Sequence, residues 1–160
     1  MNTATLIKKC LKGNARAQQL LYEQYLPYVL SIVRRFGVRQ AEERDLIQDI
    51  FIAVFQGLER FDPNKGDLHH WIRGLAIHKT IAFQRKQQRL RAEELMISEQ
   101  SSHTTTIDLS HYDAEYLLDL IAQLPAGART VFNLYVVDGY SHEEIGKMLD
   151  ISPVGSWSQL

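Results

Sequence analysis

A basic and aromatic segment between Leu68 and Ala92 is the part of the sequence best suited to binding a nucleic acid. It contains six Lys or Arg residues and no Asp or Glu; the six are Arg73, Lys79, Arg85, Lys86, Arg89 and Arg91. Aromatic and histidine side chains are interleaved with them, namely His69, His70, Trp71, His78 and Phe83. Counterion release favours phosphates on such a surface, and aromatic rings can stack on unpaired bases. A solvated helix with a basic C-terminal end would have the same composition, and the helix dipole would favour it.

A second polar group, Asp45, Gln48 and Asp49, recurs at helical spacing and could dock a basic partner. By pattern alone, such a group is more typical of the solvated face of an amphipathic helix.

The histidines suggest a metal site, but their spacing does not favour one. His69 and His70 are adjacent and should point to different sides of a helix, while His78 is too far along the axis to join them. We therefore expect no metal site and no cofactor. The sequence also has no glycine-rich phosphate loop and no suitably spaced Ser, His and Asp set. An enzyme, such as a metal-dependent phosphodiesterase using the three histidines, is the less favoured alternative.

Three amphipathic helices are predicted to position these groups. The first covers residues 14–37, with Asn14 as its expected N-cap, the second covers about residues 42–60, and the third starts at Leu68 and extends past Arg85. Turn-forming residues 61–66 precede the third helix, and Asp67 can cap it. Trp71 lies in line with Leu75 at helical spacing and is expected in the core of this small bundle.

The rest of the chain is predicted to be a linker and a second helical domain. Residues 92–112 contain four acidic residues, no Lys or Arg and no sustained periodicity, which indicates a flexible acidic linker.

Further helices are predicted from Asp113 to Leu124 and over residues 126–138, although residues 131–137 have strand-like propensity. A capping box at residues 141–144 and the pair Ser152–Pro153 then predict a helix-turn-helix.

Charge is divided unequally between the two parts. Residues 1–91 carry 16 basic and 8 acidic side chains, and residues 92–160 carry 2 basic and 11 acidic ones, so the net charge of -1 hides +8 and -9. The sequence has neither a long apolar run nor a secretory signal, so a membrane span and secretion are not expected. A single cysteine, Cys10, excludes an internal disulfide and fits the cytoplasm.

Several motifs, in this order and spacing, resemble the bacterial extracytoplasmic-function (ECF) type of RNA polymerase sigma factor. Residues 17–91 resemble its second conserved region, through Asp45–Phe51, Arg60–Asp62, His70–Ile72 and Leu75–Ala76. Residues 113–160 resemble its fourth region, through Leu124–Pro125, Arg129–Phe132, Gly139–Ile145 and Ser156–Leu160. The resemblance implies an all-α protein with a region 2 domain at 1–91, a linker at 92–112 and a region 4 helix-turn-helix domain at 113–160.

The same resemblance implies a function without catalysis. The protein would confer promoter recognition on core RNA polymerase and initiate transcription by capturing the minus-ten strand and binding the minus-thirty-five element. Its partners would be the clamp helices of the largest polymerase subunit, the flap of the second subunit, promoter DNA and an anti-sigma factor. We expect a monomer when it is free.

Site residues follow from the matched motifs. Asp45, Gln48 and Asp49 would dock on the polymerase. The minus-ten contacts would be Asn64, Lys65, His70, Arg73, His78, Lys79, Arg85, Lys86 and Arg89. The minus-thirty-five contacts would be Ser152, Ser156, Trp157 and Gln159.

The chain departs from the family pattern at two places. Ile77, His78 and Ala82 stand where an Arg-Asn pair and a later Asp are frequent, so promoter specificity does not carry over. The last helix lacks the usual basic continuation, from which we expect a C-terminally truncated chain that binds the upstream element weakly. The main alternative is an autonomous helix-turn-helix transcription regulator that never engages polymerase.

Overall fold

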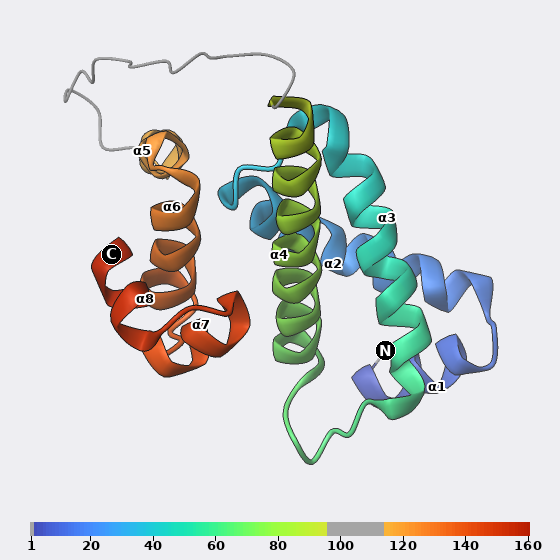
Figure 1. Ribbon diagram of the computed structural model, residues 1–160. Helices are drawn as coiled ribbons and strands as arrows, with labels where there is room; N and C mark the ends of the chain where they lie inside the picture. The colour runs from blue at the N-terminus through green and yellow to red at the C-terminus, as the bar shows by residue number, and fades with distance from the viewer. Residues whose placement is uncertain (1, 96–113) are drawn as a thin grey trace. The chain divides into compact units, whose positions relative to one another are not determined.

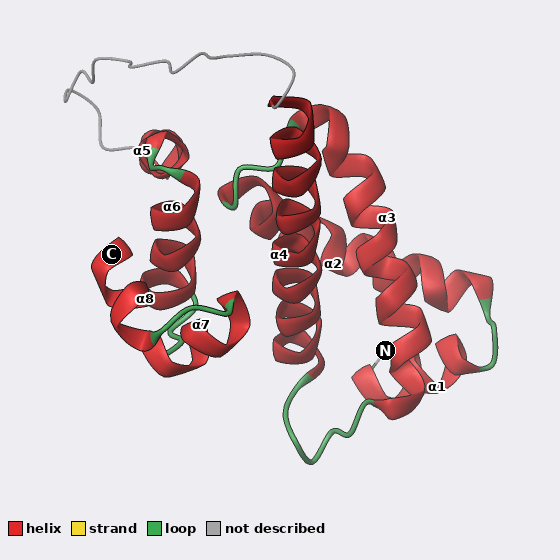
Figure 2. Cartoon of the chain, in the orientation of Figure 1, coloured by secondary structure: helices red, strands yellow, loops and turns green. Residues whose placement is uncertain are grey.

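The computed structural model describes residues 2–95 and 114–160, and their regular secondary structure is entirely helical (Figures 1 and 2). This confirms the predicted all-α class. The chain divides into two compact units, residues 1–81 and 82–160, with the boundary inside helix α4. The domain limits at residues 91 and 113 stay a prediction.

The N-terminal unit is built from α1 (Thr3–Leu11), α2 (Ala15–Arg35), α3 (Gln40–Gly57), the short 3-10 helix η1 (Leu58–Arg60) and the first part of α4 (Leu68–Leu95). Asn14 caps α2 as predicted, since its Oδ1 accepts a hydrogen bond of 2.9 Å from the Ala17 backbone N–H. Gly37 follows this helix with a φ of 78°. Helix α1 was not predicted from the sequence; Asn2 caps it through a 2.8 Å bond from the Thr5 N–H.

The core of this unit is a set of aliphatic side chains that recur every three or four residues along α2, α3 and α4. Those with at most 2% of their surface exposed include Leu21, Val29, Val33, Leu46, Ile50, Val54, Ile72, Ala76 and Ile77. Their burial fixes which side of α3 and α4 faces inward, and therefore which polar groups face solvent.

Helix α4 begins where predicted and ends later than predicted. Asp67 Oδ1 accepts a 2.7 Å hydrogen bond from the His70 N–H, so Asp67 is the predicted cap. The helix continues to Leu95, so the first four residues of the predicted linker are helical. Ala, Glu and Leu at 92–95 are strong helix formers, and neither Gly nor Pro interrupts them. The remaining linker residues and the predicted cap Asp113 lie outside the described residues.

The helices that follow are α5 (Ala114–Gln123), α6 (Ala126–Phe132), the π-helix η2 (Asn133–Val137), α7 (His142–Leu149) and α8 (Pro153–Gln159). The helical prediction for residues 131–137 is confirmed, in spite of their strand-like propensity. The last five of them adopt π geometry, in which the Asp138 N–H donates to the Asn133 carbonyl at 2.9 Å.

The helix-turn-helix formed by α7 and α8 has the predicted caps. Ser141 and Glu144 make a reciprocal capping box at the start of α7. Hydrogen bonds from Ser141 lower the pKa of the Glu144 carboxyl below its ordinary value. Asp150 adopts the left-handed conformation after α7, with a φ of 56°, and Ser152 caps α8 through the Gly155 N–H.

Gly146 lets the turn of this motif approach α7 closely, and its replacement should destabilise the protein. A Cβ at Gly146 would lie 2.8 Å from the Ile151 carbonyl oxygen. We expect Gly146→Ala to lower the free energy of unfolding by about 1–3 kcal/mol, which thermal unfolding of the full chain would detect.

Gly74→Ala is the matched control, because a Cβ at this position within α4 meets nothing within 4 Å. It should stabilise the protein by up to about 1 kcal/mol through helix propensity. A Gly146→Ala protein as stable as the wild type would contradict the close packing of the turn.

Candidate functional site

Asp45, Gln48 and Asp49 form one solvent-exposed face of α3, which we call the acidic face. Residues Leu46 and Ile50 of the same helix are buried in the core. The spacing of three and four residues places the three polar side chains together on the opposite side. The structure thus brings together the predicted docking residues, whose role stays a prediction.

A polar loop, residues 61–67, connects η1 to α4 and is held by its own hydrogen bonds. Asp62 Oδ1 accepts from the Asn64 N–H and from Asn64 Nδ2, both at 3.0 Å. The Lys65 N–H donates to the Asp62 carbonyl at 3.0 Å. These bonds leave Asn64 and Lys65 exposed at the surface of the loop, where side chains can meet a ligand.

Behind this loop is a cavity of about 350 Å³. Its lining combines polar loop residues with the first turn of α4: Arg60, Phe61, Asp62, Lys65, Gly66, Asp67, His70 and Trp71. The Trp71 ring lies 5.6 Å from the Phe61 ring, and a Cβ at Gly57 would lie 2.8 Å from it. Trp71 is half-buried rather than part of the core, where it was expected, because its ring lies over Gly57 at the side of the cavity.

Five of the predicted minus-ten residues share one exposed face of α4, which we call the basic face: His78, Lys79, Arg85, Lys86 and Arg89. At 3.6 residues per turn they fall within about a third of the helix circumference. The buried residues Ala76, Ile77 and Thr80 occupy the opposite side. Arg73 is half-buried and does not belong to this face. His70 and the loop residues lie before it, at the cavity.

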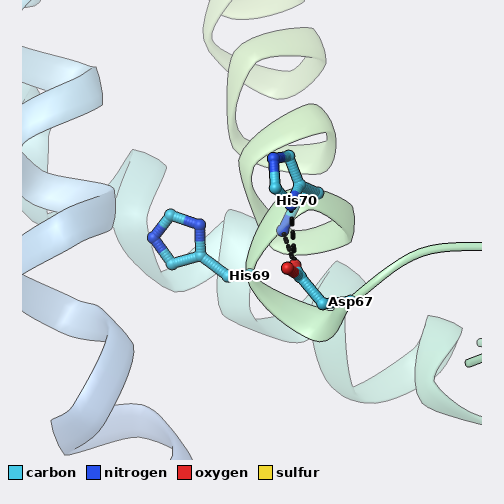
Figure 3. Close-up of side chains that lie close together, drawn as sticks. All are labelled: Asp67, His69 and His70. Atoms are coloured by element: carbon cyan, nitrogen blue, oxygen red, sulfur yellow. Dashed lines mark hydrogen bonds and ion pairs between the residues drawn. The ribbon is translucent and has the colours of Figure 1, made fainter.

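Asp67, His69 and His70 come together at the start of α4 (Figure 3). The two rings point in different directions, as predicted, and the His69 ring packs 4.1 Å from the Tyr28 ring. One donor atom from each of the three side chains nevertheless lies within 4.8 Å of the others. Neighbouring residues are only about 100° apart around a helix axis, so donor atoms of two adjacent side chains can lie close together. His78 is not part of this group.

Asp67 carries more than one bond in this cluster. Its Oδ1 accepts from the His70 N–H and lies 2.9 Å from His70 Nδ1. These hydrogen bonds stabilise the ionised carboxylate and lower the pKa of Asp67 below its ordinary value.

The predicted minus-thirty-five residues separate into two groups. Trp157 is 69% exposed, and Ser152 and Gln159 are also exposed. Ser156 is fully buried, and its Oγ lies 3.0 Å from His142 Nδ1. Because Ser156 is buried and bonded, we leave it out of the DNA-facing surface proposed below, and its contact with DNA stays a prediction.

His142 is a residue that the sequence analysis did not assign to the site. Its ring stacks on Tyr135 with centroids 4.3 Å apart and also contacts Ser156, so it connects η2 and α7 to α8. The contact between His142 and Ser156 joins residues 14 positions apart on two helices, so no local sequence pattern indicates it.

No helix within the described residues is both long enough and apolar enough to cross a membrane.

Family models match both parts of the chain. The model described as sigma-70 region 2 matches residues 21–90, and the model described as sigma-70, region 4 matches residues 114–160.

Curated relatives are similar over nearly the whole chain. The ECF RNA polymerase sigma-E factor of Escherichia coli (strain K12) is 27% identical over 165 residues, covering 94% of this chain and 84% of the relative. The ECF RNA polymerase sigma-E factor of Haemophilus influenzae is 24% identical over 163 residues, covering 94% and 85%.

Two solved structures show the same fold. CnrH in complex with the cytosolic domain of CnrY has a TM-score of 0.52 and 23% identity, and the match covers 98% of this chain and 88% of CnrH. The sigma factor RpoE in complex with the anti-sigma factor NepR from Bartonella quintana has a TM-score of 0.56 and 15% identity, covering 89% and 88%.

Proposed function

The chain belongs to the ECF type of the sigma-70 family of RNA polymerase sigma factors, and from this premise we propose how its surfaces recognise a promoter. A sigma factor gives core RNA polymerase its promoter recognition, and that is the function of this chain. Sigma factors are not enzymes, so the phosphodiesterase alternative is not favoured. We place the protein in the cytoplasm, where the polymerase works.

The acidic face of α3 is our proposed docking surface for the clamp helices of the largest polymerase subunit. Its three polar side chains project from a helix whose other side is fixed in the core, so they are held on a rigid element. Such charges raise the rate of encounter with a basic surface and select the correct partner. Region 4 would contact the flap of the second subunit.

The loop at residues 61–67 and the cavity behind it are our proposed site for a base flipped out of the minus-ten element. Flipping costs a few kcal/mol, and stacking on an aromatic ring returns about 1–3 kcal/mol per base. Trp71 and Phe61 supply aromatic surface in the cavity, and Arg60, Lys65 and His70 line it with polar groups. This combination of stacking and polar groups is the observation that carries the proposal.

The basic face of α4 would hold the displaced strand by its phosphates after the base has been captured. Its cationic side chains are exposed and follow one another along the helix, as phosphates do along an extended strand. Arg73 is not included in this face because it is half-buried.

Helix α8 is our proposed reader of the minus-thirty-five element, with Trp157, Gln159 and Ser152 at the DNA. Trp157→Ala should weaken binding of the holoenzyme to a duplex with this element by about tenfold, since a good base contact is worth about 1–3 kcal/mol. The loss should disappear on a duplex whose element is scrambled. Fluorescence anisotropy measures both affinities.

Ser156→Ala is the comparison on the same helix, because it removes a buried bond to His142 and no surface group. It should lower the free energy of unfolding by about 1 kcal/mol. If Ser156→Ala weakened DNA binding more than Trp157→Ala while leaving stability unchanged, our assignment of the DNA-facing side of α8 would be wrong.

An anti-sigma factor is a further proposed partner. The two solved structures described above are complexes, one with the cytosolic domain of CnrY and one with the anti-sigma factor NepR. Exposed apolar residues in the C-terminal unit give such a partner a surface to cover: Tyr135, Val136, Val137, Val154 and Trp157.

Retention of core RNA polymerase on the immobilised chain tests the proposed function against the alternative of an autonomous helix-turn-helix regulator. We expect the full chain to retain core polymerase without DNA. A chain that binds a specific duplex alone and never retains polymerase would support the regulator instead.

A further inference from the structure

We propose that Asp67, His69 and His70 bind a divalent transition-metal ion at the start of α4. Asp67 ends the loop that we assign to base capture, His69 and His70 lie in the first turn of α4, and their donor atoms lie within 4.8 Å of one another (Figure 3). Two imidazoles and one carboxylate form a donor set that suits Zn²⁺, Co²⁺ and Ni²⁺. Mg²⁺ and Ca²⁺ prefer oxygen ligands and do not fit it.

One edge of the site already has the spacing of a metal-bound pair. His70 Nδ1 and Asp67 Oδ1 are 2.9 Å apart. Two ligands at about 2.1 Å from a metal are about 3 Å apart when they are at right angles and about 3.4 Å apart at the tetrahedral angle, which is close to this separation. An ion can therefore replace the hydrogen bond between these atoms without moving the backbone.

The third donor requires only a side-chain movement. His69 is exposed, and its ring rests on Tyr28 rather than being enclosed. The side chains of Asp67 and His70 have 63% and 68% of their surface exposed, so an ion and its water ligands have room. The positive end of the α4 dipole opposes the cation, and the Asp67 carboxylate offsets that effect.

The location gives such an ion a role. Asp67 and His70 line the 350 Å³ cavity, while Asp67 and His69 line a second cavity of about 630 Å³ that is also lined by α1 and by Tyr25. An ion bound to all three side chains lies at the shared border and removes His70 from the capture site. Metal binding therefore competes with capture of the minus-ten strand; this second step rests on the proposed function.

Titration of the untagged full chain with Co²⁺, followed by visible absorption, tests the site itself. We expect one ion per chain and a ligand-field spectrum that excess Zn²⁺ abolishes. Asp67→Asn keeps an N-cap, and Asp67→Asn and His69→Gln should each weaken Co²⁺ binding at least about tenfold, equivalent to about 1.4 kcal/mol.

His78→Ala is the matched control, since it removes an exposed imidazole from the same helix and none of the three donors. Its Co²⁺ affinity should equal that of the wild type. Unchanged affinity in both Asp67→Asn and His69→Gln, or lost affinity in His78→Ala, would overturn the site.

Competition is tested with the holoenzyme and a single-stranded minus-ten oligonucleotide. Saturating Zn²⁺ should weaken oligonucleotide binding by the wild type at least about tenfold, and His69→Gln should be insensitive to Zn²⁺. Equal affinity with and without Zn²⁺ would overturn the competition alone. Failure of the proposed function would give a different result, since the oligonucleotide would then fail to bind the holoenzyme even in the absence of Zn²⁺.

Discussion

Asp49→Arg should weaken binding of the chain to core RNA polymerase by roughly 30-fold or more, which is ~2 kcal/mol. The substitution places a positive charge within the acidic face of α3, where we propose that a basic partner surface docks. Because Asp49 is exposed and its neighbour Ile50 carries the core packing, the fold should not change. Titration of labelled chain with core polymerase measures the affinity, and circular dichroism checks the fold.

Glu23→Arg makes the same change of charge at an exposed position on α2, outside the acidic face. It should bind core polymerase as the wild type does. Equal weakening by both substitutions would show that overall charge, rather than the acidic face, determines polymerase binding.

Simultaneous replacement of Lys79, Lys86 and Arg89 by Ala should weaken capture of the minus-ten strand on the order of 10- to 100-fold at physiological salt. All three are exposed on the basic face of α4. Each phosphate contact to a single strand contributes about 0.7 to the slope of log affinity against log salt. The slope should therefore become shallower by about 2. Oligonucleotide binding to the holoenzyme, measured over a range of salt concentrations, gives both quantities.

Replacement of Lys9, Lys12 and Arg16 by Ala also removes three positive charges, from the end of α1, its C-cap and the start of α2. This control should leave the salt slope close to the wild-type value. A slope that changes equally in both triple variants would mean that the strand responds to net charge and not to the basic face.

The sequence was sufficient for the parts of the fold that depend on local signals. Asn14, Asp67, Ser141 and Ser152 cap helices as predicted, since a capping side chain bonds to a backbone N–H only two or three residues away. The amphipathic spacing of α3 also placed the acidic face correctly.

Features that depend on packing between elements were not predictable in the same way. Ser156 is a small polar residue in a short exposed-looking helix, and only the positions of His142 and Tyr135 reveal that it is buried. Trp71 is half-buried because Gly57 on another helix leaves space for its ring. The proximity of His69 and His70 depends on side-chain rotamers in the first turn of α4, which spacing does not specify.

Run-off transcription with purified core RNA polymerase on a library of promoter fragments tests the central claim most directly. Adding the chain should produce transcripts from a defined subset of fragments that share minus-ten and minus-thirty-five elements. Core polymerase alone should not produce them, and Asp49→Arg should reduce them. The account is contradicted if the folded chain binds core polymerase or DNA and yet no fragment gives a transcript that depends on it.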